Sequence, residues 1–380
     1  MEEETLTIRD KLFSVIRAGM SLDTEAPDLS DADCEELIRI GTQQAILPVI
    51  CRGMKSCGAP EAWIAVCSRA QNRDLYQHIQ REYALKQICK ALDGDGIPYV
   101  LLKGAVLCRL YPAPELRTSI DIDILVHEED LDRAVRALES GTDFRMRDKA
   151  YHNVSMINAH VHLELHFTIK ENAEQIDSLL SRAWDYAQAA GEGSRYSFTP
   201  EFLAFHVIAH MCHHFLHGGL GVRPFLDLWL VRNRTVFDED ALRRMCSACG
   251  VLKFYEECGR LSDVWLKKEA HTETTRALEE YCFSGGVFGS SRFKNAGRQR
   301  KKRGFRYILS RVFPPAYEVE EFYRDETGKK HTLAYYYIKR LRSWFSKDRR
   351  DQLREDVQTV LSSDREYLDK TGWLFKQLEL

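Results

Sequence analysis

The most regular hydrophobic pattern in the chain lies at residues 120–126, where apolar and polar side chains alternate. The apolar members share one side of the pattern and are Ile120, Ile122, Ile124 and Val126. Asp121 and Asp123 fall on the other side. Alternation with a period of two predicts a strand with one buried face. Because two carboxylates one pleat apart repel each other, their arrangement favours a hard divalent cation.

A second alternating segment follows at residues 161–168. Its predicted inward residues are Val161, Leu163 and Leu165, and its polar residues are His162, Glu164 and His166. Two aspartates on one strand and a third carboxylate on a neighbouring strand are typical of two-metal phosphoryl or nucleotidyl transfer. The all-oxygen set of Asp121, Asp123 and Glu164 favours Mg²⁺ or Mn²⁺ over Zn²⁺. The spacing of His162 and His166 leaves a zinc site open as the alternative.

Between residues 97 and 198 the pattern changes repeatedly between strand and helix. Besides the two segments above, it predicts strands at 97–102, 142–147, 152–158 and 196–198. It predicts helices at 104–111, 128–140 and 176–186. The chain is therefore expected to be an α+β protein with a small mixed sheet.

Helical periodicity dominates both flanks of this region. Residues 5–92 read as helices, the last of which runs from about Glu61 to Gly94, and they are expected to buttress the sheet. Thr199 and Pro200 form a good helix start, with an N-cap followed by proline at the first helical position. The expected organisation is an N-terminal helical region at 1–95, a core at 96–198 and a mostly helical C-terminal domain at 199–380.

A Lys-Gly pair follows the first predicted strand of the core. Lys103 and Gly104 lie where that strand turns into a short helix. Backbone N–H groups at such a turn, together with one cation, suit the β- and γ-phosphates of a nucleotide. Arg117 either binds the same triphosphate or pairs with one of the aspartates when metal is absent. The alternative for Lys103 is an ordinary surface lysine before a helix.

The helix after Thr199 is rich in histidine, with His206, His210, His213, His214 and His217. Their spacing resembles a zinc-binding comb, but no carboxylate or cysteine stands at matching spacing. We expect the second wall of a cleft to come from His210, His214, Arg223 and Asp227. Of these, His210 and Arg223 are expected to face Glu164 and to contact nucleotide or acceptor. The alternative is an Arg223–Asp227 pair, one helical turn apart, that only stabilises the helix start.

Composition excludes several classes of protein. The chain has 380 residues, of which 44% are hydrophobic and 29% charged, with a net charge of −3. These values suit a globular protein and argue against one that coats nucleic acid. No apolar run approaches the ~20 residues of a membrane span, and the acidic start is unlike a signal peptide. Eleven scattered cysteines, including the lone Cys246-x2-Cys249 motif, predict reduced thiols and a cytoplasmic location.

One basic stretch stands out near the C-terminus. Residues 292–311 carry many arginines and lysines with aromatic side chains between them and no acidic residue. Such a stretch either binds RNA or a phosphorylated acceptor, or forms a solvated loop.

The run LLKG-x12-R-x3-DIDILV at 101–126, followed by LELH at 163–166, resembles the uncharacterised nucleotidyltransferase family of the polymerase-β-like superfamily. More distantly, it is similar to AbiEii-type toxins. The resemblance covers roughly residues 95–235. The chain departs from the superfamily in two respects: Lys103-Gly104 replaces the usual Gly-Ser turn, and the gap from that turn to Asp121 is longer.

The resemblance implies transfer of NMP from an NTP, such as ATP, to a protein, RNA or small-molecule acceptor. Asp121, Asp123 and Glu164 would hold Mg²⁺ or Mn²⁺, and Glu164 would also help to deprotonate the acceptor. His166 would position substrate or shuttle a proton, while Lys103, Gly104 and Arg117 would hold the leaving phosphates. The alternatives are a catalytically weak nucleotide-binding scaffold and an RNA-modifying toxin of a toxin–antitoxin pair.

Overall fold

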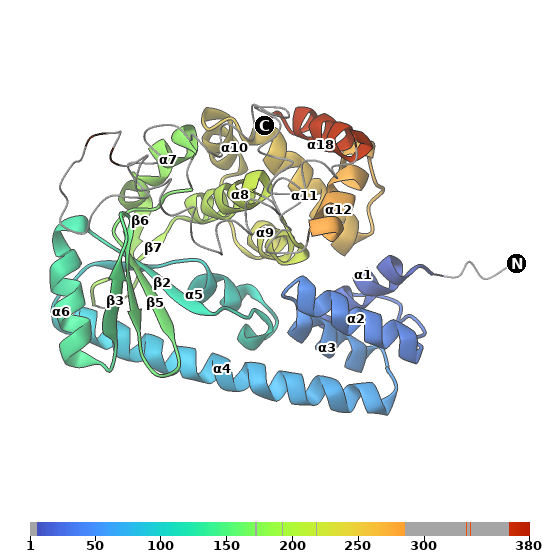
Figure 1. The fold of residues 1–380 in the computed structure, drawn as a ribbon, viewed down its shortest axis with the longest axis horizontal. Coiled ribbons are helices and arrows are strands. Elements are labelled where there is room, and N and C mark those ends of the chain that lie inside the picture. The colour runs from blue at the N-terminus through green and yellow to red at the C-terminus, as the bar shows by residue number, and fades with distance from the viewer. Residues whose placement is uncertain are drawn as a thin grey trace, which may run out of the picture.

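The computed structural model describes residues 6–171, 173–191, 193–217, 219–285, 332, 335 and 365–380. At one end of the molecule lies a seven-stranded sheet with the order β3-β4-β5-β2-β1-β7-β6, flanked by helices (Figure 1). Its strands are β1 (Tyr99–Leu101), β2 (Asp121–Val126), β3 (Arg145–Lys149), β4 (Asn153–Ile157), β5 (His162–His166), β6 (Ala187–Ala189) and β7 (Arg195–Phe198). Two neighbouring pairs, β2–β5 and β1–β7, are parallel and the others are antiparallel. The predicted α+β fold with a mixed sheet is confirmed.

Helices precede and follow the sheet, as predicted. Those before it are α1 (Ile8–Gly19), α2 (Asp31–Gln43), α3 (Leu47–Ser56) and α4 (Glu61–Gly94). Those within the sheet region are α5 (Gly104–Leu107), α6 (Leu131–Gly141) and α7 (Glu174–Leu180). Those after it are α8 (Pro200–His217), α9 (Val222–Arg234), α10 (Glu239–Ala248), α11 (Leu252–Lys267), α12 (Glu273–Gly285) and α18 (Arg365–Gln377). The basic stretch 292–311 lies outside the described residues.

Local sequence signals fix several helix starts. Thr7 and Ser30 each form a capping box, with Asp10 and Asp33 respectively, so that both α1 and α2 begin with satisfied backbone donors. At α8 the Thr199 hydroxyl accepts a hydrogen bond from a backbone N–H of the first turn. Thr199 therefore acts as the predicted N-cap.

The strictly alternating segment is shorter than the sequence pattern suggests. Strand β2 begins at Asp121, so Ile120 lies ahead of the strand and its side chain is 82% exposed. The prediction that Ile120 faces inward is therefore wrong. Ile122 and Ile124 are buried as expected, and Leu125 is buried on the opposite face.

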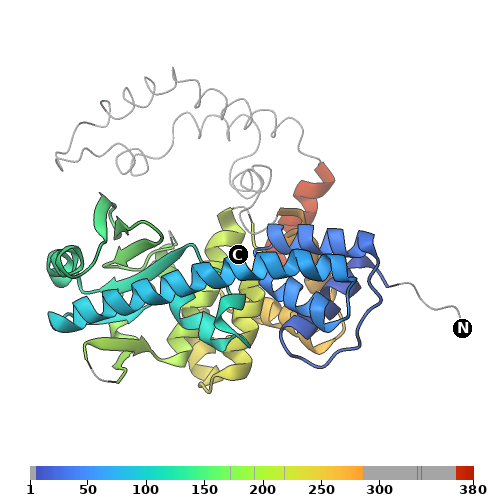
Figure 2. The same ribbon diagram turned by 90° about the horizontal axis from the view of Figure 1, so that it is seen from below.

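Two hydrophobic cores lie on the two faces of the sheet. One face packs on the second half of α4 and on α6, through residues such as Leu85, Ile88 and Leu138. On the other face, Val100 and Leu125 join a larger core that includes α8 and α9. Figures 1 and 2 show α4 running along the molecule, and in Figure 1 α8 and α9 lie on the opposite side of β2 from α4. Functional side chains on β2 can therefore face only the α8–α9 side.

The N-terminal helices do not all pack on the sheet, so the prediction that they all buttress it is wrong in part. Only the second half of α4 covers the sheet, whereas α1, α2 and α3 share the larger core with α8–α12. The division into parts at residues 95 and 198 stays a prediction. All eleven cysteines are free. Within the described ranges, no helix combines the length with the apolarity that a membrane crossing requires.

Candidate active site

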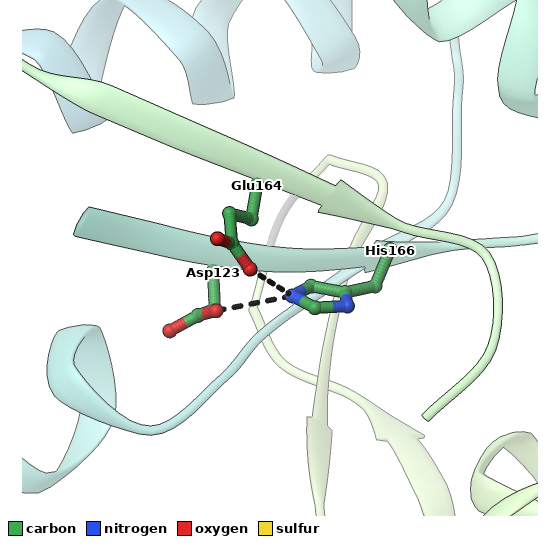
Figure 3. Close-up of side chains that lie close together, drawn as sticks. All are labelled: Asp123, Glu164 and His166. Carbon is green, nitrogen blue, oxygen red and sulfur yellow. Dashed lines mark hydrogen bonds and ion pairs between the residues drawn. The ribbon is translucent and has the colours of Figure 1, made fainter. Parts of the chain in front are cut away.

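The parallel pairing of β2 with β5 brings the candidate carboxylates together. In this register Asp121 stands opposite His162, Asp123 opposite Glu164, and Leu125 opposite His166. Donor atoms of Asp123, Glu164 and His166 lie within 4.8 Å of one another (Figure 3). Asp121 stands outside this cluster, and its carboxylate accepts a 2.9 Å hydrogen bond from the Ser119 hydroxyl.

His166 lies between the two clustered carboxylates. Its Nε2 is 3.0 Å from Asp123 Oδ1 and 3.4 Å from Glu164 Oε2. Burial alone would lower the pKa of His166, but its hydrogen bonds to both carboxylates outweigh burial and raise it. The hydrogen bond from His166 in turn lowers the pKa of Glu164. When protonated, His166 places one positive charge where two carboxylates would otherwise repel each other.

The donor chemistry of this cluster fits a divalent cation. Asp123 and Glu164 offer oxygen atoms from adjacent strands, and Asp121 offers a third carboxylate on the wall of the same cleft. Oxygen donors suit Mg²⁺ or Mn²⁺. The alternative zinc site on His162 and His166 is not formed, because His162 Nε2 bonds the Ser155 hydroxyl at 2.7 Å and only His166 joins the described cluster.

A cleft of about 270 Å³ lies in front of the carboxylates. Ten of the eleven residues that the sequence assigned to the site line it, namely Lys103, Gly104, Arg117, Asp121, Asp123, Glu164, His210, His214, Arg223 and Asp227. The eleventh, His166, lies just behind, bonded to Asp123. One wall of the cleft comes from β2, β5 and the turn after β1, and the other comes from α8 and the start of α9.

Lys103 occupies a strained turn at the cleft. Its φ of +37° lies in the left-handed region, which side chains other than glycine rarely adopt. Burial alone would lower the pKa of Lys103, but Asp123, Glu171 and other nearby carboxylates raise it. Reciprocally, Lys103 and His166 hold the pKa of Asp123 well below its usual range despite burial. In the described part of the chain, no hydrogen bond or ion pair engages the Lys103 ammonium, which stays charged and available to an anion.

The helix after Lys103 differs from the predicted one. Residues 104–111 were expected to form a helix with free N–H groups, but α5 ends at Leu107 and a 3₁₀ turn follows. The N–H groups of Ala105, Val106 and Leu107 already donate to the carbonyls of Leu102 and Lys103. The ammonium of Lys103 is therefore the main source of attraction for an anion at this turn, and a contribution from the Gly104 backbone stays a prediction.

Gly104 has a steric reason to be glycine. A Cβ at this position would lie 2.9 Å from Ser119 Oγ and 3.1 Å from Arg117 Nη1. Both contacts are closer than ordinary packing allows. The glycine therefore lets the Arg117 and Ser119 side chains approach the turn.

Arg117 forms a buried ion pair that the sequence did not predict. Its Nε and Nη2 donate to the two carboxylate oxygens of Asp227 at 2.8 and 2.9 Å, and the Tyr111 hydroxyl donates to the same carboxylate at 2.8 Å. Of the two alternatives for Arg117, pairing with Asp121 or Asp123 is therefore wrong, whereas triphosphate binding stays a prediction. The Arg223–Asp227 alternative is also wrong, because Arg223 instead contacts the Thr118 carbonyl at 3.4 Å. Through this ion pair Arg117 holds α9 against the segment that precedes β2. Arg223 lines the cleft.

His210 contributes through a hydrogen-bonded chain. Its Nδ1 is 2.9 Å from Glu171 Oε1, and its Nε2 is 3.1 Å from His214 Nε2. Burial lowers the pKa of His210, and it lowers that of His214 to about 3. Both rings are therefore neutral near pH 7, and both nitrogens of His210 have partners. Among the described residues the α8 histidines form no group of three metal donors.

Glu171 is the site residue that sequence reasoning missed. It is only 5% exposed, and its charge acts on both His210 and Lys103. Burial alone would raise its pKa, but His210 and Lys103 hold the pKa of Glu171 well below its usual range. The residue lies in the loop between β5 and α7, where no periodic pattern marks it.

Glu171→Gln is expected to destabilise the protein by about 2 kcal/mol at pH 7, the usual loss for a hydrogen bond to a charged group. Because the folded-state pKa of Glu171 is depressed, its contribution is complete above the unfolded value, about 4.3. It is lost as pH falls below that value. Urea unfolding at pH 7 and near pH 3 should therefore show a difference from the wild type that narrows in acid. Glu174→Gln, on the exposed start of α7, is the control and should change little at either pH. Equal behaviour of the two variants would contradict this role for Glu171.

A comparison with known protein families identifies the family of this chain. The family model described as "Uncharacterised nucleotidyltransferase" matches residues 30–267. Among curated proteins none matches. The family match extends beyond the resemblance at 95–235 to α2–α4 and to α10–α11, whose sequences read only as generic helices. Since the match covers well over half of its length, the chain belongs to this uncharacterised nucleotidyltransferase family.

Proposed function

We propose that the chain transfers NMP from an NTP to an acceptor, using Mg²⁺ or Mn²⁺ held by Asp121, Asp123 and Glu164. Membership of the family supports nucleotidyl transfer as the general function. One observation carries the finer proposal: Asp123 and Glu164 stand opposite each other on parallel strands, in a cleft that also holds Lys103 and Arg223. When bound, the metal neutralises phosphate charge and orients the phosphates.

In the proposed reaction, an oxygen of the acceptor forms a bond to the α-phosphorus. The bond from that phosphorus to the pyrophosphate oxygen breaks, and its electron pair leaves with pyrophosphate. Glu164, ionised because His166 lowers its pKa, takes the acceptor's proton. The Lys103 ammonium binds the leaving phosphates, and Arg223 adds a second positive charge from α9. Catalysis of this kind depends mainly on positioning and charge neutralisation.

The second wall of the cleft serves positioning in this proposal. Because both nitrogens of His210 already have partners, its role is to hold Glu171 beside Lys103 rather than to exchange protons with substrate. The buried Arg117–Asp227 pair fixes the start of α9, from which Arg223 reaches the cleft. The proposed location is the cytoplasm, supported by eleven free cysteines.

The function is tested by following two labels. The protein is incubated with Mg²⁺, a cell extract and each NTP in turn, labelled either at the α- or at the γ-phosphate. We expect the α label to appear on an acceptor and the γ label in pyrophosphate. Release of labelled orthophosphate by the purified protein would instead indicate hydrolysis. Nucleotide binding without pyrophosphate release would identify a binding protein.

Lys103→Ala should weaken NTP binding by about a hundredfold, as loss of one or two charged hydrogen bonds predicts. Binding of NMP should change little, because NMP lacks the phosphates that Lys103 contacts. Isothermal titration with NTP and NMP measures both affinities. The control is Lys149→Ala, which removes an exposed lysine from the edge strand β3. Equal losses for NTP and NMP would show that Lys103 acts only on the structure of the cleft.

A further inference from the structure

A second cavity, of about 530 Å³, lies on the face of the sheet opposite the active-site cleft. It is bounded by the second half of α4, by β1 and by the β6–β7 hairpin. Tyr99 and Leu101 of β1 line it and belong to the core beneath α4, whereas Asp121 and Asp123 face α8 and α9. The two cavities share no lining residue. Because most of its charged lining residues are cationic, this second cavity is named the basic cavity.

Positive charge predominates in the basic cavity. Its four cationic lining residues are Lys86, Lys90, Arg109 and Arg195, and its two acidic ones are Glu82 and Asp93. Asp93 already accepts hydrogen bonds from the Ser194 N–H at 2.8 Å and the Tyr99 hydroxyl at 3.4 Å. Considering the described residues only, none of the four cationic side chains takes part in an ion pair or hydrogen bond.

Arg195 is the least expected of these cations. Its Nε is fully buried and, within the described part of the structure, has no hydrogen-bond partner. Burying an N–H donor of a charged group without a hydrogen-bond partner costs free energy, because the donor loses its hydrogen bonds to water and forms none in the protein. The residue is held in place by β7, where Arg195 stands opposite Tyr99 of β1. Because Arg195 also lines the basic cavity, an anion bound there would supply a counter-charge to its guanidinium.

We propose that the basic cavity binds a small phosphate-bearing molecule of up to nucleotide size. Four cations facing a single free carboxylate call for a ligand with more than one negative charge, and a phosphate monoester carries about −1.5 to −2 at pH 7. The guanidinium of Arg195 matches phosphate geometry. The cavity volume lies within the range of small-molecule sites, roughly 300–1,000 Å³. This inference goes beyond the proposed transfer reaction and does not depend on it.

The cavity contains its own reporter, which separates it from the active-site cleft. Cys89 lines the basic cavity, and only Cys89 and Cys57 of the eleven cysteines are not fully buried. Cys57 follows α3 and serves as an internal control. A bound anion would shield the Cys89 thiol and disfavour its thiolate, the form that reacts. Alkylation of each cysteine is followed by mass spectrometry near pH 8.5 in the presence of a chelator.

The probes are inorganic phosphate, a nucleoside monophosphate, a short single-stranded RNA, and acetate at matched ionic strength. We expect phosphate or the nucleoside monophosphate to slow alkylation of Cys89 severalfold, with Cys57 unchanged. Tighter protection by the nucleoside monophosphate identifies a nucleotide ligand, and equal protection identifies free phosphate. The proposal is overturned if acetate protects equally, if Cys57 is slowed to the same extent, if only RNA protects, or if nothing does.

Matched variants test which charges act. Lys86→Ala/Lys90→Ala should raise the half-protecting concentration about tenfold or more, as loss of charged hydrogen bonds predicts. Lys55→Ala/Arg69→Ala removes two exposed cations elsewhere and should leave that concentration unchanged within about twofold. Asp121→Asn/Asp123→Asn should also leave it unchanged, so failure of the proposed reaction would not affect this test. Equal weakening in the Lys55→Ala/Arg69→Ala protein would show a general charge effect and overturn the proposal.

Discussion

Asp121→Asn/Asp123→Asn is expected to reduce NTP turnover by at least about 10³-fold, the scale on which loss of electrostatic stabilisation acts in active sites. The double variant leaves the side-chain shapes nearly unchanged but removes two of the three carboxylates on β2 and β5. It also takes from His166 its buried partner Asp123, 3.0 Å away. Turnover is measured as pyrophosphate release with Mg²⁺ and, separately, with Mn²⁺.

The same variant separates metal binding from folding. In the wild type, metal with NTP at a hundredfold excess over Kd should add about 2.7 kcal/mol of stability. That gain should disappear in the double variant, while its circular dichroism spectrum stays that of a folded protein. Asp95→Asn/Asp132→Asn removes two exposed aspartates instead and should keep both turnover and the gain. If the Asp121→Asn/Asp123→Asn protein still responds to metal and NTP, the metal site lies elsewhere.

The sheet was predictable because its signal is local. Strict alternation in β2 and β5 identifies the buried and the polar face of each strand over six or fewer residues. A shift of one residue in the pairing of β2 would turn Asp123 toward the hydrophobic core beneath α4. The error at Ile120 has the same origin, because alternation marks a face but not the residue at which pairing begins. Strand β3 was placed a few residues too early, at 142–147, since its own residues are all exposed and give no hydrophobic pattern.

The partners of the charged residues were not predictable, because they come from distant parts of the chain. Arg117 and Asp227 are 110 residues apart, and Glu171 reaches His210 from an irregular loop. Periodicity gives the face on which a side chain lies but not what faces it from another element. The sequence therefore indicated which residues line the cleft, whereas their roles stay proposals. No sequence pattern indicated that Arg117 forms an ion pair with Asp227 rather than with a carboxylate of β2.

That buried pair gives the largest expected effect on stability. Asp227→Asn should destabilise the protein by about 3–5 kcal/mol, the usual cost of leaving one buried charge without its partner. Arg117 and Asp227 are only 8% and 5% exposed, so water solvates the unpaired Arg117 guanidinium poorly. Denaturant unfolding measures the change. Tyr111→Phe removes only the hydroxyl that donates to the Asp227 carboxylate and should destabilise the protein by about 2 kcal/mol.

A double replacement distinguishes a structural Arg117 from one that also binds phosphate. Arg117→Met/Asp227→Leu removes both charges, and replacing a buried pair with apolar residues is often nearly neutral. We therefore expect this protein to be more stable than Asp227→Asn, which gives a coupling energy in a double-mutant cycle. If Arg117 only holds α9 against the turn, the stable double variant should keep most of its NTP affinity. If the guanidinium also reaches the triphosphate from the cleft wall, NTP affinity should fall while NMP affinity does not. An Asp227→Asn protein as stable as the wild type would contradict the buried ion pair itself.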